Sequence, residues 1–394
     1  MGEGGTGSLS ISGSGSVTTG STTRLIVGRN AGASGTFTLA SGGTASTLAV
    51  VGGSGGSRLV FAGGVLKALG SGTAFVSGLT EAVVRTGGAV IDTNGQTVTV
   101  SQGLLHDPSL GATVDGGLVK RGLGTLTLSG SNTYTGLTTV TGGHLVIDGS
   151  LAGSLIVNSG GSVGGTGTLR TTLVFAGGSL APGGSATPGV LRSTGTVTMA
   201  AGSTLAIDLA SAGAGALAAD ALTAAGDVLL NGGVLALASP DTLAARWLAS
   251  QEIITGRTVL GTFRAIDGVP LVDGSRLAPT YTATSARVTV AAAGDLNIDG
   301  AIDLLDVAGF VSSGLYDTGA GGTWDRGDFN GDGLIDLLDA ADFLTTGLYD
   351  TGSYAAPASA VASVPEPAGL AGAGGAIALA TLIRRRRRTT CVRT

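Results

Sequence analysis

The sequence predicts a mainly β protein: a right-handed parallel β-solenoid, then a small α-helical calcium-binding module, then a C-terminal transmembrane helix. Three observations support this fold class. Short runs that alternate apolar and Ser/Thr residues recur between glycine pairs. Two Asp-rich loops with the same internal spacing lie within residues 295–339, and an apolar segment precedes five consecutive arginines, Arg384 to Arg388.

The composition limits the fold before any motif is considered. Glycine accounts for 73 of 394 residues, while 43% of the chain is hydrophobic and only 12% is charged. Glycine without a three-residue period excludes collagen, and this apolar content argues against disorder. The one cysteine, Cys391, excludes an internal disulfide.

The strand-like runs predict a solenoid over residues 1–210. The clearest runs are 124–128, 144–147, 154–157, 195–199 and 204–209. Alternation with period two is typical of strands, and Gly-Gly or Asn-Gly pairs supply the turns between them. No amphipathic helix precedes residue 210, so the connections are too short for helical crossovers and a stack of rungs is favoured.

Repetition is clearest at the beginning of the chain. The segments 7–17 (GSLSISGSGSV) and 35–45 (GTFTLASGGTA) place Leu9 and Ile11 where Phe37 and Leu39 fall. This part resembles repeats shared by bacterial type V secretion proteins and PEP-CTERM proteins. Residues 124–149 (GTLTLSGSNTYTGLTTVTGGHLVIDG) are similar to the autotransporter-associated β-strand repeat, which implies an exported β-solenoid.

Residues 211–293 are assigned as the C-terminal cap of the solenoid. The Ala-rich stretch 212–225 is compatible with a short helix or with a further rung, and 258–290 again has a strand pattern. Terminal units of repeat proteins are atypical because they shield the open end of the stack.

Residues 294–352 predict two calcium loops. This segment contains twelve aspartates and one basic residue, Arg326, so its net charge is −11. Residues 1–293 carry 14 basic and 13 acidic residues, a net charge of +1. Calcium binds oxygen ligands from positions 1, 3, 5, 7, 9 and 12 of such a loop, with glycine at position 6. The expected ligands of the two ions are Asp295, Asn297, Asp299, the Ala301 carbonyl, Asp303 and Asp306, and Asp328, Asn330, Asp332, the Leu334 carbonyl, Asp336 and Asp339.

One departure from the common pattern, present in both loops, and one alternative accompany this prediction. Position 12 is Asp in both loops, where the common pattern has a bidentate Glu. The alternative is an acidic surface loop without a metal. Four carboxylates in one loop would repel one another without a cation, and the spacing occurs twice, which favours calcium.

A duplicated segment follows each loop. Residues 302–319 and 335–352 match at 13 of 18 positions. Each predicts a short helix whose apolar residues face the other helix: Leu304, Leu305, Ala308 and Val311, and Leu337, Leu338, Ala341 and Leu344. Ile302 and Ile335, at position 8, are expected to meet in a short strand contact, and Trp324 is expected to be a packing residue.

The loop-helix pair over residues 294–352 resembles the type I dockerin module, in the version found in planctomycete secreted proteins. The resemblance implies two bound calcium ions. It also implies a protein partner at positions that are apolar here, namely Leu304, Leu305, Leu337 and Leu338. The module is therefore expected to take a protein or polysaccharide partner.

After a linker, 353–363, the chain has the order of a sorting signal over 364–388, followed by a tail, 389–394. Val364–Pro367 (VPEP) precedes the apolar stretch Ala368–Ile383 and the arginine run. An apolar helix followed by basic residues is typical of a membrane segment with a cytoplasmic basic end. The order resembles the PEP-CTERM sorting signal, which implies an exosortase-type enzyme acting at Val364–Arg388 and at least transient membrane contact through Ala368–Ile383.

The sequence predicts a cell-surface or extracellular location. The first residues, MGEGGTGSLS, have neither a basic n-region nor an apolar h-region. The start is therefore expected to be truncated, with an export signal upstream of residue 1.

The titratable residues of the solenoid predict a protein that is not an enzyme. The two histidines, His106 and His144, and the single carboxylates Asp92, Asp115 and Asp148 are too dispersed to propose a catalytic group. No basic surface interleaved with aromatic residues indicates nucleic acid. The leading hypothesis is a non-catalytic surface or matrix protein. The alternatives are a polysaccharide-binding or polysaccharide-degrading component of a dockerin-linked glycan-processing assembly and a plain autotransporter passenger.

Overall fold

The computed structural model describes residues 1–184, 188–213, 215–239, 247–268 and 275–355. The chain divides into a compact unit, Met1–Tyr354, and a second unit, Ala355–Thr394. The expected sorting signal 364–388, its apolar segment Ala368–Ile383 and Cys391 lie outside the described residues. Among the residues that are described, no helix is long and apolar enough to cross a membrane.

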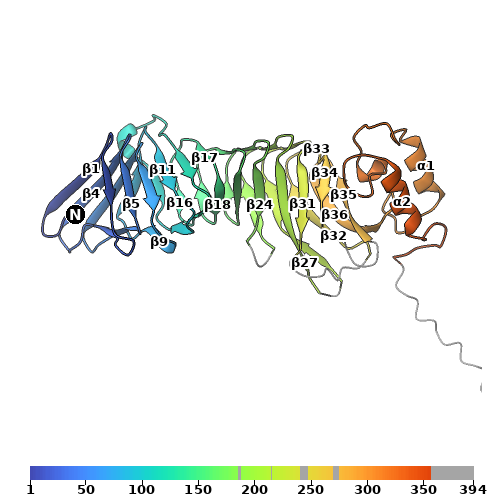
Figure 1. Ribbon diagram of the computed structural model, residues 1–394, viewed down its shortest axis with the longest axis horizontal. Helices are drawn as coiled ribbons and strands as arrows, with labels where there is room; N and C mark the ends of the chain where they lie inside the picture. Colours follow the sequence, from blue (N-terminus) through green and yellow to red (C-terminus); the bar gives the residue numbers. More distant parts are fainter. Residues whose placement is uncertain (185–187, 214, 240–246, 269–274, 356–394) are drawn as a thin grey trace, which may run out of the picture. The chain divides into compact units, whose positions relative to one another are not determined.

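The compact unit is mainly β, and its strands form a ladder in which each strand pairs in parallel with the corresponding strand of the next rung (Figure 1). The five-stranded sheet contains β1 (Thr6–Ile11), β4 (Ser34–Ala40), β7 (Gly56–Ala62), β10 (Glu81–Val84) and β13 (Leu104–His106). The path of the eleven-stranded sheet is β2 (Ser16–Thr18), β5 (Thr44–Thr47), β8 (Val65–Ala68), β11 (Ala89–Asp92), β14 (Leu118–Arg121), β17 (Thr138–Val140), β20 (Leu155–Val157), β23 (Thr172–Val174), β26 (Val197–Met199), β30 (Val228–Asn231) and β33 (Val259–Thr262).

Two further sheets complete the rungs. The twelve-stranded sheet contains β3 (Leu25–Val27), β6 (Val50–Gly52), β9 (Gly72–Ser77), β12 (Val98–Val100), β15 (Thr125–Leu128), β18 (Gly143–Ile147), β21 (Gly161–Gly165), β24 (Ser179–Pro182), β27 (Thr204–Ser211), β31 (Val234–Ala238) and β34 (Ala265–Asp267), with β28 (Leu217–Ala219) antiparallel to β27. The eight-stranded sheet contains β16 (Ser131–Asn132), β19 (Ser150–Leu151), β22 (Thr168–Leu169), β25 (Val190–Ser193), β29 (Ala221–Ala224), β32 (Ser250–Thr255), β36 (Ser285–Ala292) and β35 (Ser275–Tyr281). This arrangement is compatible with the expected parallel β-solenoid.

The register of the ladder follows the repeats in the sequence. Leu9 is paired with Phe37, and Ile11 with Leu39, as the alignment of the first two repeats predicts. The predicted strands at 124–128, 144–147, 154–157, 195–199 and 204–209 are confirmed, each within a residue or two of its expected bounds. Local alternation of apolar and polar residues was therefore sufficient to locate these rungs.

Stacked apolar side chains form the core of the ladder. Leu126, Leu145, Val163, Leu180 and Leu205 follow one another in register from β15 to β27, and each is 0% exposed. Because period-two alternation sends every second side chain inward, each rung contributes to such columns. Each rung therefore buries its apolar face only against its neighbours, as in other repeat architectures.

The ladder continues past the expected boundary at residue 210, which falls inside β27. Parallel pairing extends through β29, β30 and β31 to β33 and β34. The Ala-rich stretch therefore contributes a further rung through β29. Its sequence was ambiguous because alanine is a good helix former and also small enough for the interior of a rung. The antiparallel hairpin β35–β36 ends the ladder, so the cap is shorter than residues 211–293.

The helical module follows the hairpin. It contains α1 (Leu304–Ser312), the 3₁₀ turn η3 (Trp324–Arg326) and α2 (Leu337–Thr345), and another 3₁₀ turn, η1 (Pro108–Leu110), lies within the ladder. Trp324 is 2% exposed, which confirms its expected packing role.

Candidate functional site

The first Asp-rich loop closes around two buried carboxylates. Asp295 and Asp306, at positions 1 and 12, are 0% and 2% exposed. The Asp295 carboxylate accepts hydrogen bonds from the backbone N–H groups of Asp299 (3.2 Å) and Gly300 (2.9 Å). Asp306 accepts one from the N–H of Asp303 (2.9 Å), which completes a capping box at the start of α1. The loop and the helix are thus fixed by the same two acids.

The second loop repeats this construction. Asp328 and Asp339 are 4% and 0% exposed. Asp328 accepts from the N–H groups of Gly331 (2.8 Å) and Gly333 (3.0 Å), and Asp339 accepts from that of Asp336 (2.9 Å). The duplication in the sequence therefore extends to the hydrogen bonds of the backbone.

Position 6 has the predicted sharp turn in both loops. Gly300 and Gly333 both have φ of +88°, a region that side chains with a Cβ rarely adopt. A Cβ on Gly333 would also lie 2.1 Å from the Arg264 carbonyl of the last rung. Glycine at this position is required by the turn in both loops and by a close approach in the second.

Positions 3 and 5 lie at the loop surface. The Asn297 side-chain amide donates to the Asp299 carboxylate (2.9 Å), and Asn330 donates to Asp332 in the same way (3.1 Å). The side chains of positions 3 and 5 are therefore neighbours in each loop, as the ligand spacing requires.

Positions 7 and 9 connect each loop to the helix that follows it. Ala301 and Leu334, the expected carbonyl ligands, donate their N–H groups to the carboxylates of position 5. Asp303 and Asp336 are the N-caps of α1 and α2. Among the described residues, no group of three or more Asp, Glu, His or Cys side chains is placed to hold a metal ion.

The electrostatics of the loops favour a cation. Burial raises the pKa of Asp295, Asp339 and Asp328, the last to about 7. The nearby charge of Asp306 adds to the rise at Asp295, and that of Asp339 adds to the rise at Asp328. Buried like charges of this kind are stabilised either by protonation or by a bound cation. All the donors are oxygen atoms, so the loops fit calcium in donor chemistry and in chain spacing.

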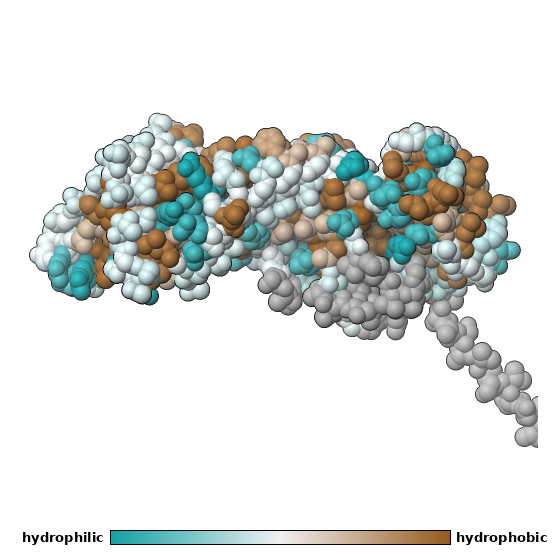
Figure 2. Space-filling view, in the orientation of Figure 1, coloured by the Kyte–Doolittle hydropathy of each residue, from teal (hydrophilic) through white to brown (hydrophobic). Residues whose placement is uncertain are grey.

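The expected contact face of the two helices is wrong. The residues predicted to face the other helix are instead exposed, by 68% for Leu304 and Leu305, 70% for Val311 and Leu337, 61% for Leu338 and 73% for Leu344. A cavity of about 220 Å³ between the helices is lined by Val307 and Phe310 of α1 and by Ala340, Phe343 and Leu344 of α2, so Leu344 alone of the predicted residues borders it. The reason is the capping box: Asp306 must turn into its loop, and this fixes the rotation of α1. Figure 2 shows hydrophobic side chains gathered on the outer surface of this module.

The expected contact between the position 8 residues is also replaced by another. Ile302 forms an isolated bridge with Tyr349, and its carbonyl accepts from the N–H of Asp350 (2.9 Å). The Ile335 carbonyl accepts from the N–H of Asp317 (2.9 Å). Each loop thus pairs with the turn that follows the helix of the other repeat, which links the repeats reciprocally.

The module is joined to the end of the ladder by specific contacts. The Trp324 indole N–H donates to the Asp295 carbonyl (2.8 Å), and Trp324 packs with Phe329 against Ala278 and Ala291 of the hairpin. Arg276 of β35 forms an ion pair with Asp342 of α2 (3.0 Å). The module and the hairpin therefore share one small core.

Two further contacts tie the loops themselves to the ladder. The N–H of Ile266 in β34 donates to the Gly331 carbonyl of the second loop (2.7 Å). The Tyr354 hydroxyl donates to the Asp295 carboxylate of the first loop and accepts from the N–H of Ala292 in β36. The second loop therefore covers part of the last rung.

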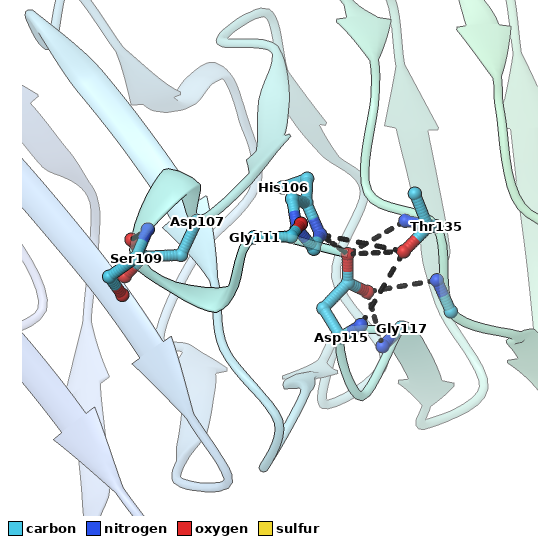
Figure 3. Close-up of polar contacts among 8 residues, drawn as sticks. His106, Asp107, Ser109, Gly111, Asp115, Gly117 and Thr135 are labelled. Carbon is cyan, nitrogen blue, oxygen red and sulfur yellow. Dashed lines mark hydrogen bonds and ion pairs between the residues drawn. The ribbon is translucent and has the colours of Figure 1, made fainter. Parts of the chain in front are cut away.

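Within the ladder, the densest polar cluster surrounds Asp115 (Figure 3). Its carboxylate accepts from the N–H groups of Gly117 (2.9 Å), Thr135 (2.7 Å) and Gly136 (2.9 Å). It also accepts from His106 Nδ1 at 2.7 Å. Burial acts to raise the pKa of Asp115, but these hydrogen bonds outweigh it and hold the pKa below its usual value.

The geometry of His106 indicates a structural role. Its Nδ1 contacts both the Asp115 carboxylate and the Thr135 hydroxyl (3.4 Å), while Nε2 contacts the Gly111 carbonyl (3.1 Å). In a nucleophilic triad the carboxylate and the hydroxyl lie on opposite ring nitrogens, so this arrangement cannot activate Thr135. The hydrogen bond to Asp115 raises the pKa of His106, because the carboxylate stabilises the protonated ring.

The other titratable residues singled out in the sequence do not join this cluster. Asp92 accepts from the N–H of Asn94 (2.8 Å) within its own turn, and Asp148 accepts from that of Thr166 (3.4 Å), 18 residues further along the chain. His144 lies in β18, where burial and then the charge of Lys120 lower its pKa. These contacts stabilise turns and the packing of neighbouring rungs.

Sequence reasoning missed Lys120. This residue of β14 is 0% exposed, and its Nζ donates to the Thr93 hydroxyl and to the carbonyls of Arg121, Gly122 and Gly142. Burial lowers its pKa to about 8. The only sequence signal was a lysine at an inward position of an alternating strand, LVKR, where an apolar residue is expected.

One comparison with known proteins concerns the middle of the ladder. A family model described as the passenger-associated-transport-repeat matches residues 118–147, which contain β14 to β18. This supports the predicted autotransporter-associated repeat and a passenger-type repeat protein.

Two curated proteins are similar over short stretches. An "Extracellular serine protease" of Serratia marcescens is 46% identical over 67 residues, which cover 17% of this chain and 6% of that protein. The "Adhesin BmaC autotransporter" of Brucella suis biovar 1 (strain 1330) is 48% identical over 71 residues, which cover 17% of this chain and 2% of that protein. The chain thus spans only a small part of either relative.

Proposed function

We propose that this chain is a non-catalytic, exported surface or matrix protein whose parallel ladder is closed by a calcium-stabilised, dockerin-like module. The observation that carries the proposal is the ladder itself, in which a rung-forming segment matches a passenger repeat. The carboxylates and histidines singled out in the ladder are engaged in turn and packing contacts, as the His106 cluster illustrates. The similarity to an adhesin supports a binding role rather than catalysis.

Calcium is the proposed metal, with one ion in each loop. Asp295 and Asp306 would contribute to the first site and Asp328 and Asp339 to the second, with the other predicted oxygen donors of each loop. The ion would supply the positive charge that buried carboxylates require, so its binding energy would also be folding energy. At about a hundredfold excess over Kd, each ion is expected to raise the free energy of unfolding by about 2.7 kcal/mol.

Isothermal titration of the EDTA-stripped full chain with calcium tests this proposal. The expected result is two sites, lost when Asp295→Asn and Asp328→Asn are combined. The control combines Asp317→Asn and Asp350→Asn, which make the same charge change outside the loops, at exposed positions with φ of 55° that asparagine also tolerates. No heat of binding by the parent chain, or equal loss in the control, would refute calcium binding by these loops.

The location is proposed to be the cell surface or the extracellular space, with sorting by an exosortase-type enzyme at Val364–Arg388 and transient membrane contact through Ala368–Ile383. The order of motif, apolar stretch and arginines supports this. Deleting residues 368–394 from an exported form should release the protein into the medium. Continued retention at the surface would contradict the proposed anchor.

The second candidate function is a polysaccharide-binding or polysaccharide-degrading component of a dockerin-linked assembly. Its specific support is the exposure of Leu304, Leu305, Leu337 and Leu338, the positions at which the dockerin resemblance implies a partner. Release of reducing sugars from a polysaccharide by the purified chain would favour this candidate over the first.

A further inference from the structure

A cleft of about 1000 Å³ lies between the last rung of the ladder and the helical module. One wall comes from the turn after β33 and from the end of β35, and the other from the first Asp-rich loop and η3. The lining of the cleft includes Asn231, Arg264, Tyr281, Leu296, Ile298, Asp325 and Arg326.

The walls of this cleft are held in place by contacts on both sides. The Tyr281 hydroxyl accepts from the N–H of Phe263 (3.2 Å), which fixes the end of β35 to the last rung. Trp324, bonded to the Asp295 carbonyl, fixes η3 to the first loop. Preformed clefts of this size are the usual form of ligand sites, and the volume is at the upper end for a drug-sized molecule, so it suits an oligomer segment.

Among the described residues, two arginines of the cleft have no close ion-pair partner, and one carboxylate, that of Asp325, also lines the cleft. Among the described residues, Arg264 makes no ion pair, and the nearest carboxylate to Arg326 is that of its neighbour Asp325 at 3.9 Å, with both side chains more than half exposed. The other described arginines of the last rungs and the hairpin are paired: Arg257 with Asp227, Arg276 with Asp342 and Arg287 with Glu252. Exposed guanidinium groups without a close partner are suited to bind carboxylates.

The rest of the lining matches a sugar chain better than a bare anion. The side-chain amide of Asn231 offers a donor and an acceptor for hydroxyl groups. Leu296, Ile298 and the ring of Tyr281 add apolar surface that suits the C–H faces of pyranose rings. The combination of cationic, amide and apolar groups is that expected for an acidic oligosaccharide.

We propose that this cleft binds a segment of an acidic, uronate-containing polysaccharide, with its carboxylates on Arg264 and Arg326. The inference rests on the exported location in the proposed function. It places recognition of a surface or matrix polymer at the junction between ladder and module, away from the exposed leucines of α1 and α2.

Calorimetry of the full chain with oligoglucuronate, and with a neutral cello-oligosaccharide of equal length, tests the proposal. Oligoglucuronate should bind, and the neutral oligomer should bind at least about tenfold more weakly, since it has no carboxylates to pair with the guanidinium groups. Arg264→Gln and Arg326→Gln should each weaken binding by about tenfold. Arg257→Gln, which removes an exposed arginine from a neighbouring rung, is the matched control.

Three results would overturn the proposal: no binding of oligoglucuronate, equal binding by the parent chain and both cleft variants, or equally tight binding of oligoglutamate. The last would show that the cleft recognises charge alone. Because calcium titration of the loops is measured separately, failure here leaves the proposed calcium sites to be judged on their own result.

Discussion

At the residue scale, the hydrogen-bonded pair of His106 and Asp115 connects the segment between β13 and β14 to the next rung. The Asp115 carboxylate accepts hydrogen bonds from the backbone N–H groups of Gly117, Thr135 and Gly136. Without it, these N–H groups would lack this acceptor. Buried N–H groups without an acceptor destabilise a fold, so this single side chain has consequences beyond its own position.

The His106 pair predicts a pH dependence of stability. The pKa of His106 is raised in the folded state, so its contribution to the free energy of unfolding is fully present below about pH 6.5 and is lost as pH rises through the folded pKa. We expect urea midpoints to fall across this window in the parent chain. In His106→Gln that fall should disappear.

His144 serves as the internal control for this titration. Its pKa is lowered by burial, so protonation opposes folding and stability falls as pH decreases below about 6.5, the opposite sign. Retaining the full pH-dependent loss above 6.5 in His106→Gln would contradict the structural role assigned to the pair.

At the element scale, the turn between β17 and β18 contains a position that only glycine fits, and the glycine before it provides a matched test. Gly143 has φ of +64°, and a Cβ there would lie 2.5 Å from the Gly122 carbonyl oxygen. The adjacent Gly142 has no heavy atom within 4 Å of such a Cβ. The turn therefore requires glycine at position 143 but leaves room for a side chain at position 142.

We expect Gly143→Ala to lower the free energy of unfolding by about 2 kcal/mol or more, because a left-handed backbone costs about 1–2 kcal/mol and the overlap adds to it. Gly142→Ala should be neutral or stabilising by up to about 1 kcal/mol, since it reduces the freedom of the unfolded chain. Chemical denaturation measures both. Equal effects of the two substitutions would show that rung register does not require this turn.

The helices of the module show how one polar residue sets the orientation of an element. The apolar residues of α1 and α2 suggested a leucine-lined contact, but the capping boxes turn Asp306 and Asp339 into the loops. Phe310 of α1 and Phe343 of α2 instead line the cavity between the helices, and the leucines that begin each helix are exposed. The hydrophobic pattern alone did not predict this orientation. It counts apolar residues, but it does not show that a carboxylate on the same helix will be buried and hydrogen-bonded in the loop.

At the scale of the whole molecule, the module is part of the closure of the ladder rather than a separate appendage. Trp324 and Phe329 pack with alanines of β35 and β36, and the second loop bonds to β34. Loops that are proposed to bind calcium therefore touch the last rungs directly. Binding an ion would stabilise these rungs as well as the module.

This shared core predicts cooperative unfolding of module and hairpin. Trp324→Ala should cost about 3–5 kcal/mol, as expected for loss of a large buried aromatic side chain. Hydrogen exchange should then show lost protection in β35–β36 as well as in α1 and α2. Leu344→Ala, at an exposed apolar position of α2, is the control and should change stability by no more than about 0.5 kcal/mol.

Lost protection confined to α1 and α2 would instead show that the module folds independently of the hairpin.

The sequence by itself determined the rungs, their register, the turn at position 6 of both loops and the packing role of Trp324. These features depend on local periodicity and on backbone conformations that few residues adopt, so they can be inferred from neighbouring residues. The tertiary structure decided where the ladder ends, which faces of the helices meet, how Lys120 is satisfied and where the cleft forms. Each of these depends on contacts between segments far apart in the chain, and no local pattern encodes which distant groups will share one hydrogen bond or one buried surface.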